Sequence, residues 1–208
     1  MENELIEYKS ILKNIEIIYK IKRSEFIGNS FYVKSEIDAK EKIKEISFKY
    51  KNATHNCWAY KIGKNFNYSD NGEPSGTAGK PILGSIEKYD LNNILIIVTR
   101  YFGGIKLGVR GLIDAYSETA EKTIISSKIA KYKKSTLYRI KAEYSKYSEI
   151  ERMLKRYDGW NIKKQTFSDY VVFEILINDN ENIFNILKNK SKEMLKIGIE
   201  EIPTEVKV

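Results

Sequence analysis

Hydrophobic and polar positions in the first quarter of the chain change period twice, which predicts two strands and then a helix. Residues 15–21 and 26–33 are rich in β-branched and aromatic side chains and flank four polar residues, a pattern typical of a hairpin. Apolar residues then recur at helical spacing over 36–50, and Ser35 and Asp38 have the spacing of a capping box. A helix is therefore predicted directly after the hairpin.

The next elements are predicted from apolar runs bounded by turn residues. Residues 94–99 (ILIIVT) form a nearly continuous apolar run, as expected of a strand buried on both faces. The predicted strands are 56–62, 66–69 and 94–99, and the predicted helices lie near 80–88 and 112–127.

The pattern starts again near residue 135. It predicts, in order, a strand at 136–144, a helix at 147–157, strands at 161–168 and 171–177, a helix at 183–194 and a strand at 197–206. This βαββαβ order is that of the ferredoxin-like split unit. We therefore predict an α+β protein of two domains, 1–130 and 134–208, with a linker near 128–135. Each half has its own apolar strands and helices and is expected to fold alone.

Glycine is concentrated in one stretch, residues 68–116, which holds eight of the twelve glycines and two of the three prolines. It contains the motifs YSDNGEPSGTAGKP (68–81) and YFGGIKLGVRGLIDAY (101–116). Because glycine loses the most backbone entropy on folding, such a concentration indicates bends or close approaches that side chains would block. We expect the two glycine-rich turns to face each other.

These motifs, with KRSEFI at 22–27 and THNCWAY at 54–60, resemble the signature of the YigZ/IMPACT family. The resemblance covers the whole chain, more weakly in its C-terminal half. It implies an N-terminal domain like the second domain of ribosomal protein S5 and a ferredoxin-like C-terminal domain similar to the fifth domain of elongation factor G. In eukaryotic members the related domain is associated with translational control through protein partners. Arg110 departs from the pattern, because the family usually has glycine there.

The net charge of +8 favours an anionic partner, since summed charge sets long-range attraction. A lysine-rich composition can equally reflect an AT-rich genome. The charge is uneven, because residues 126–141 carry six basic side chains and no acid: Lys128, Lys131, Lys133, Lys134, Arg139 and Lys141. With the interleaved tyrosines, these lysines could bind phosphates and stack on bases. Alternatively, they form a solvated strand face and a flexible connector, and no RNP-type aromatic motif accompanies them.

Cysteine and histidine counts exclude several classes of site. A single cysteine rules out an internal disulfide, and a single histidine rules out a multi-histidine metal site, so we expect no metal and no cofactor. The acidic start MENELIEYKS is unlike a signal peptide, and no apolar run approaches the roughly 20 residues of a membrane span. A cytoplasmic protein without a membrane partner is expected, and nothing in the sequence sets its oligomeric state.

The second glycine-rich turn runs from a buried strand into a helix, a layout that exposes backbone amides as an anion site. The residues that would form this site are Arg100, Gly103, Gly104, Lys106, Gly108, Arg110 and Gly111. Its spacing fits neither a Walker A loop nor a dinucleotide fingerprint. The alternative is that the glycines only permit tight packing. Arg110 decides between them: it points to solvent or the cleft, or it pairs with Asp114 one turn along the helix.

Four residues are candidates for catalysis: His55, Asp70, Glu73 and Ser75. They could supply a general base with a nucleophile, or two carboxylates for a hard metal. The competing interpretation is structural, because Asp and Ser favour turns by bonding local backbone groups.

Cys57 lies two residues after His55 on one strand, so their side chains share a face about 6.5 Å apart. That separation disfavours direct contact between a nucleophile and its base, and a buried cysteine usually acts as a small hydrophobe. His55 is expected to hydrogen-bond Asp70 or Glu73.

Three functions remain open from the sequence. The leading hypothesis is a non-catalytic, translation-associated regulator that binds RNA, the ribosome or a translation-factor partner. The second is a protein-only interaction module in translational control. The third is an enzyme of unknown substrate that uses the region of His55, Asp70 and Glu73.

Overall fold

A computed structural model describes residues 7–157, 160–178 and 181–206. Over these residues the protein has an α+β fold with two sheets and five helices. It divides into two compact units. The first runs to Tyr132 and also includes the chain from Pro203 onward, and the second comprises Lys133–Ile202. Each unit has a hydrophobic core of its own.

The sheet of the first unit has the order β2-β3-β6-β4-β5, and every neighbouring pair is antiparallel. Its strands are β2 (Ile15–Ile21), β3 (Ser24–Tyr32), β4 (His55–Ile62), β5 (Asn65–Ser69) and β6 (Ile94–Tyr101). The predicted hairpin is confirmed as β2 and β3. Strand β6 with its apolar run is the central strand of the sheet, because its side chains on both faces are apolar and need to be buried.

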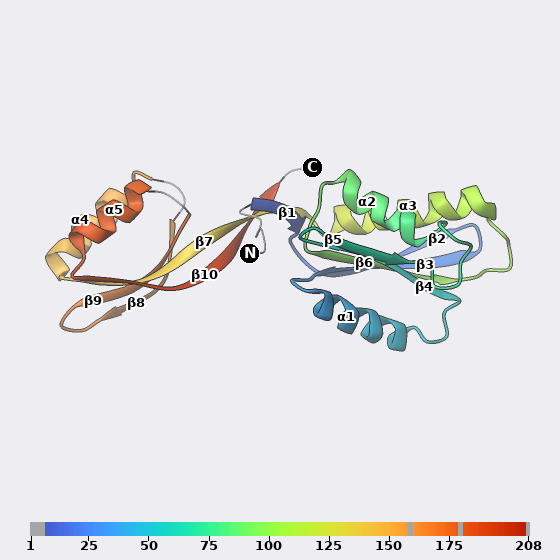
Figure 1. The fold of residues 1–208 in the computed structure, drawn as a ribbon, viewed down its shortest axis with the longest axis horizontal. Helices are drawn as coiled ribbons and strands as arrows, with labels where there is room; N and C mark the ends of the chain where they lie inside the picture. Colours follow the sequence, from blue (N-terminus) through green and yellow to red (C-terminus); the bar gives the residue numbers. More distant parts are fainter. Residues whose placement is uncertain (1–6, 158–159, 179–180, 207–208) are drawn as a thin grey trace. The chain divides into compact units, whose positions relative to one another are not determined.

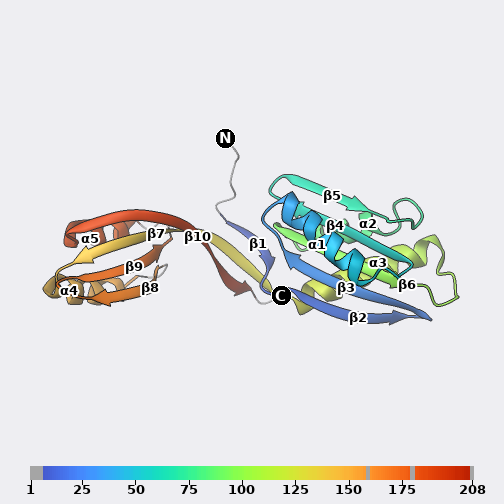
Figure 2. The same ribbon diagram turned by 90° about the horizontal axis from the view of Figure 1, so that it is seen from below.

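Helices cover both faces of this sheet, and the alternation along β6 separates the two layers (Figure 1). Ile94, Ile96 and Val98 belong to the core under α2 (Gly79–Lys88) and α3 (Gly108–Ser126). Leu95 and Ile97 belong to the core under α1 (Glu36–Lys49), which lies on the opposite face (Figure 2). The continuous apolar run is thus explained by burial on both sides.

Two local features of the sequence explain where α1 begins and where α3 crosses the sheet. Helix α1 begins with the predicted capping box, in which the Ser35 hydroxyl accepts from the Asp38 amide and the Asp38 carboxylate accepts from the Ser35 amide. Helix α3 crosses β3 at Gly28, where an added Cβ would lie 2.0 Å from Oγ1 of Thr123. Glycine is required at this crossing, because any larger residue would push the helix off the sheet.

The second unit has the predicted βαββαβ order. Its elements are β7 (Ile129–Ala142) from Lys133 onward, α4 (Tyr144–Leu154), β8 (Trp160–Phe167), β9 (Val171–Ile177), α5 (Glu181–Lys190) and β10 (Glu193–Val206) as far as Ile202. β9 pairs with both β7 and β8, and β10 pairs with β7, so the strand that follows each helix is separated from the strand before it. This arrangement is the split βαβ unit.

Two features of the chain differ from the sequence-based prediction. Strand β1 (Glu7–Ile11) was not predicted, and the segment near 128–135 that was expected to be a linker is the start of β7. Within the first unit, β1 pairs with β7, and the ring of Tyr132 stacks on the rings of Tyr8 and Tyr32. Aromatic packing therefore makes this lysine-rich segment a strand.

Candidate functional site

The two glycine-rich motifs meet at one end of the first sheet. There β4 begins beside the end of β6, with His55 directly opposite Arg100. The turn between β2 and β3 and the loop from β6 into α3 reach the same end (Figure 1). The side chains that the sequence singled out as catalytic candidates come from these neighbouring loops.

Asp70 holds the first motif together through backbone amides. Its Oδ1 accepts from the amides of Ala78 and Gly79 at 2.9 and 2.8 Å, and its Oδ2 accepts from the Gly76 amide at 2.8 Å. Two of these donors open helix α2, where unpaired amides and the helix dipole favour a carboxylate. A Cβ at Gly79 would lie 2.8 Å from the backbone of Ser69, so the loop closes tightly at this point. These contacts fit the structural interpretation of Asp70.

Glu73 lies inside the protein and is paired with Arg100. Its Oε1 is 2.6 Å from Nη1 of Arg100 and accepts a 2.9 Å hydrogen bond from the Tyr116 hydroxyl. The side chains of Glu73 and Arg100 are only 4% and 6% exposed. A buried carboxylate is tolerated when it is both paired and hydrogen-bonded, and this carboxylate is both.

The guanidinium of Arg100 is enclosed by polar and aromatic groups. Nη2 lies 3.4 Å from the Ser24 hydroxyl, and the guanidinium carbon lies 5.5 Å from the ring centroids of Phe26 and Phe102. Its Nε is buried without a hydrogen-bond partner among the described residues. The two ring faces supply the attraction that this side of the cation does not receive from hydrogen bonds.

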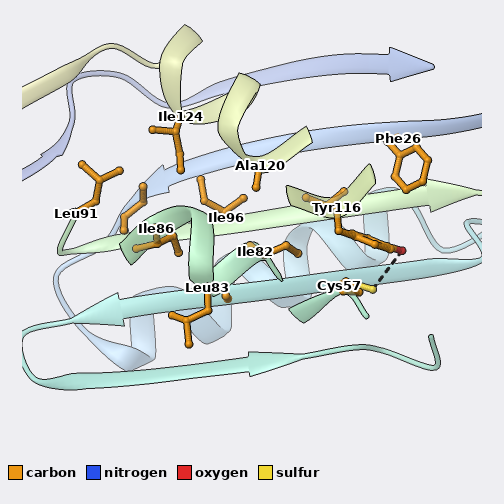
Figure 3. Close-up of a cluster of buried hydrophobic side chains, with 14 of the residues drawn as sticks. Phe26, Cys57, Ile82, Leu83, Ile86, Leu91, Ile96, Tyr116, Ala120 and Ile124 are labelled. Carbon is orange, nitrogen blue, oxygen red and sulfur yellow. Dashed lines mark hydrogen bonds between the residues drawn. The ribbon is translucent and has the colours of Figure 1, made fainter. Parts of the chain in front are cut away.

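Cys57 and Tyr116 extend the same cluster into the core (Figure 3). The Cys57 thiol donates to the carbonyl of Asp70 at 2.9 Å and lies 3.4 Å from the Tyr116 hydroxyl. Burial raises the pKa of the Cys57 thiol to about 12, and burial also raises the pKa of Tyr116. Neither group is ionised near neutral pH, so Cys57 is a poor nucleophile.

His55 is the catalytic candidate at the outer edge of this cluster. Its Nδ1 lies 2.8 Å from the carbonyl oxygen of Asn71, and its Nε2 lies 3.8 Å from Oε2 of Glu73. The 2.8 Å contact is a hydrogen bond, whereas 3.8 Å is too long for one. The hydrogen bond predicted to Asp70 or Glu73 is thus made to Asn71, in the loop between them.

Ser75, the fourth candidate, is exposed and takes no part in this cluster. The neighbouring Thr77 donates its hydroxyl to the carbonyl of Pro74 at 2.6 Å, a contact within the turn. The role of Tyr116, which lies within the helix predicted over residues 112–127, was missed in the sequence analysis. The hydroxyl of Tyr116 is the signal that could have revealed this role, because a buried tyrosine hydroxyl needs a hydrogen-bond partner.

The second glycine-rich turn is held against two neighbouring loops. The amides of Phe102 and Gly103 donate to the hydroxyls of Thr54 and Ser24 at 2.9 and 3.3 Å. A Cβ at Gly103 would lie 1.8 Å from the carbonyl oxygen of Arg23. Gly103 therefore marks a close approach of two backbones, whereas Gly104 and Gly108 adopt positive φ angles of 84° and 75°.

The charges expected to reinforce an anion site here point in different directions. Arg100 is buried with Glu73, and Nε of Arg110 pairs with Asp114 at 3.1 Å, an exposed contact along helix α3. Lys106 is exposed, and Gly111 lies in the first turn of α3. The pairing of Arg110 with Asp114 was the alternative to an anion site in the sequence analysis, and this pairing is the one observed.

Five of the six basic side chains of residues 126–141 lie on β7, and Lys128 directly precedes this strand. In the first unit Lys131 pairs with Glu7 at 3.0 Å, and in the second unit Arg139 pairs with Glu174 at 2.7 Å. Nζ of Lys141 lies 4.4 Å from the ring centroid of Tyr170. Lys128 belongs to the first unit, and Lys133 and Lys134 to the second.

Within the described residues, no three His, Cys, Asp or Glu side chains are grouped as a metal ion would need. In the same part of the chain, none of the helices has the length and apolar character needed to cross a bilayer.

Comparison with known proteins gives matches over most of the chain. The model of the Impact N-terminal domain matches residues 22–124. The IMPACT family member YvyE of Bacillus subtilis is 38% identical over 164 residues, which cover 77% of this chain and 75% of that protein. YigZ of Escherichia coli, another IMPACT family member, is 31% identical over 167 residues, 78% of this chain and 80% of that protein.

Among solved structures, a crystal structure described as that of a hypothetical protein superposes with a TM-score of 0.61. It is 24% identical in sequence, and the match covers 93% of this chain and 98% of that one. At this identity the likeness concerns the fold alone.

Proposed function

The chain belongs to the IMPACT family, and on that premise we propose that it is a non-catalytic, translation-associated protein that binds ribosomal RNA with basic side chains of β7. The link to translation is carried over from the eukaryotic members that the sequence motifs resemble. The choice of RNA as partner comes from the charges of this chain.

The observation that carries the proposal is the run of six basic side chains and no acid over residues 126–141. Phosphate contacts dominate the affinity of proteins for nucleic acids, and lysine and arginine supply them. Arg139 and Lys141 are two residues apart in the part of β7 that belongs to the second unit, and a strand places two such side chains on one face, about 6.5 Å apart. Basic side chains on an ordered strand lose less conformational entropy on binding than those of a flexible linker.

The ion pairs Lys131–Glu7 and Arg139–Glu174 of β7 do not oppose this role. Lys131 and Glu7 are about half exposed, as is Arg139 of the pair with Glu174. Exposed pairs of this kind contribute only about 0–1 kcal/mol. A phosphate can therefore replace the carboxylate partner at little cost.

Three polar side chains of the signature are engaged within the protein, which favours a role without a catalytic step. Asp70 binds three backbone amides, Glu73 is held by Arg100 and Tyr116, and Cys57 keeps its proton at neutral pH. A general base or nucleophile needs a free lone pair within reach of a substrate. The signature is better suited to fixing the shape of its loops.

Co-sedimentation with purified bacterial ribosomes through a sucrose cushion tests the proposal. The full chain should pellet with ribosomes at about 50 mM salt and be released by several hundred millimolar, as expected for phosphate contacts. Substitution of Lys131, Lys133 and Lys134 by Glu should abolish pelleting. The matched control replaces Lys20, Lys40 and Lys88, exposed lysines of other elements, and should pellet normally. Equal pelleting of the two triple variants, or failure of the wild type to pellet with ribosomes, contradicts the proposal.

A further inference from the structure

Three large apolar side chains of the second glycine-rich turn are exposed to solvent. Phe102 is 46% exposed, Ile105 38% and Val109 62%, and all three lie between the end of β6 and the first turn of α3. We call Phe102, Ile105, Lys106 and Val109 the turn surface. Single exposed apolar residues need no explanation, but three within eight residues on one turn suggest a binding surface.

The start of the turn surface is anchored to neighbouring parts of the protein. The Phe102 and Gly103 amides are bound by Thr54 and Ser24, and Gly103 packs against the backbone of Arg23. Below it, Arg100 packs on the ring of Phe102 and is fixed by Glu73. A surface that is rigid before binding loses little entropy when a partner docks, which raises affinity.

The charges around the turn surface are basic. Lys106 lies within it, and Lys22 and Arg23 lie on the β2–β3 turn that packs against Gly103. The acids of the adjoining first motif are turned inward, because Asp70 binds amides and Glu73 binds Arg100. Asp114 is paired with Arg110, and Glu25 lies 3.9 Å from Lys20. A partner with negative charge complements this surface.

From the apolar side chains and the surrounding charge we propose that the turn surface binds a protein segment that combines acidic residues with large apolar ones. RNA fits it less well, because stacking of bases requires aromatic faces. Ile105 and Val109 are aliphatic, and Phe102 already packs one cation. The inference rests on the proposed role as a binding protein but not on RNA binding by β7.

Selection from a phage-displayed library of random twelve-residue peptides tests this inference on the full chain. Selected peptides should be enriched in Asp and Glu together with Leu, Phe or Trp. A synthetic copy of the best peptide should lose at least ten-fold in affinity, measured by fluorescence anisotropy, when Ile105→Ser and Val109→Ser are combined. The matched control combines Ile37→Ser and Phe48→Ser, which are 69% and 78% exposed on α1 over the other face of the sheet. It should bind as the wild type does.

A charge variant adds a second readout. Lys106→Glu should weaken binding of the same peptide about ten-fold. Lys44 is an exposed lysine of α1, and Lys44→Glu should leave the binding unchanged. The inference is overturned if the selected peptides lack acids, or if the turn and control variants bind them equally. It is also overturned if single-stranded RNA loses affinity with Ile105→Ser and Val109→Ser while the peptide does not. RNA binding by β7 is measured separately with the lysine variants, so either proposal can fail without the other.

Discussion

Oε1 of Glu73 lies 2.6 Å from Nη1 of Arg100, and this buried contact joins the first motif to the residue directly before the second, 27 residues further along the sequence. The pair fixes the first glycine-rich loop against the last residues of β6. Because Arg100 also packs on Phe102, the same contact supports the turn that follows. The two motifs therefore act as one structural unit.

Asp70→Ala should lower the free energy of unfolding by about 2–4 kcal/mol, because three backbone amides lose a charged acceptor. Asp114→Ala, which removes an exposed carboxylate paired with Arg110, should change it by less than about 0.5 kcal/mol. Urea denaturation followed by circular dichroism measures both values. Equal effects of the two substitutions would show that the amides of α2 find other acceptors.

Cys57 should resist alkylation by iodoacetamide in the native protein at pH 8 and react once the protein is unfolded in urea. Its pKa is raised from 9.0 to about 12 in the folded state by burial. The folded state therefore holds this proton more tightly, and the resulting stability is full below pH 9 and is lost as the pH rises toward 12. The free energy of unfolding of the wild type should thus fall more steeply above pH 9 than that of Cys57→Ala. Parallel pH profiles would rule out this contribution.

Two glycine substitutions should change stability in opposite directions. Gly84 lies inside α2, and apart from its chain neighbours and the nearby backbone of its own helix no atom lies within 4 Å of an added Cβ, so Gly84→Ala should stabilise the protein by about 0.5–1 kcal/mol. Gly103→Ala places its Cβ against the carbonyl oxygen of Arg23 and should destabilise by about 2–3 kcal/mol. Thermal melting of both variants measures the difference. A neutral Gly103→Ala would mean that the turn moves freely away from the β2–β3 hairpin.

The Glu73–Arg100 pair can be tested by a double-mutant cycle. Glu73→Met should cost about 3–5 kcal/mol, because it leaves the buried Arg100 without a counter-charge. Adding Arg100→Met should restore part of that loss, with a coupling energy of at least about 2 kcal/mol. Urea unfolding of the four proteins gives the coupling. Strictly additive losses would mean that the two side chains do not depend on each other.

Most of the fold was predictable because hydrophobic periodicity is local. The capping box of α1, the run of β6 and the βαββαβ order of the second unit are all visible within short windows of sequence. Strand β1 was missed because EYKSI has little apolar character and forms its strand through pairing with the distant β7. The start of β7 was missed for a related reason, since the rings that order Tyr132 come from Tyr8 and Tyr32.

The site was predictable only where its bonds are local. The meeting of the two glycine-rich motifs and the preference of Asp70 for a turn followed from residue type. The partner of Arg100 could not be found this way, because a cation after a buried strand is equally suited to an anion site and to an ion pair. Only the fold places Glu73 beside it.

Salt dependence of RNA binding tests the central proposal most directly. The affinity of the full chain for a single-stranded RNA of about 20 nucleotides should be measured by fluorescence anisotropy at several salt concentrations. For the wild type, log K should fall linearly with log salt, and the slope should become shallower by roughly one unit for each phosphate that a variant no longer binds. Lys131→Glu, Lys133→Glu and Lys134→Glu combined should therefore give weaker binding and a flatter slope, by up to about three units. An unchanged slope in this triple variant would contradict the assignment of RNA binding to β7.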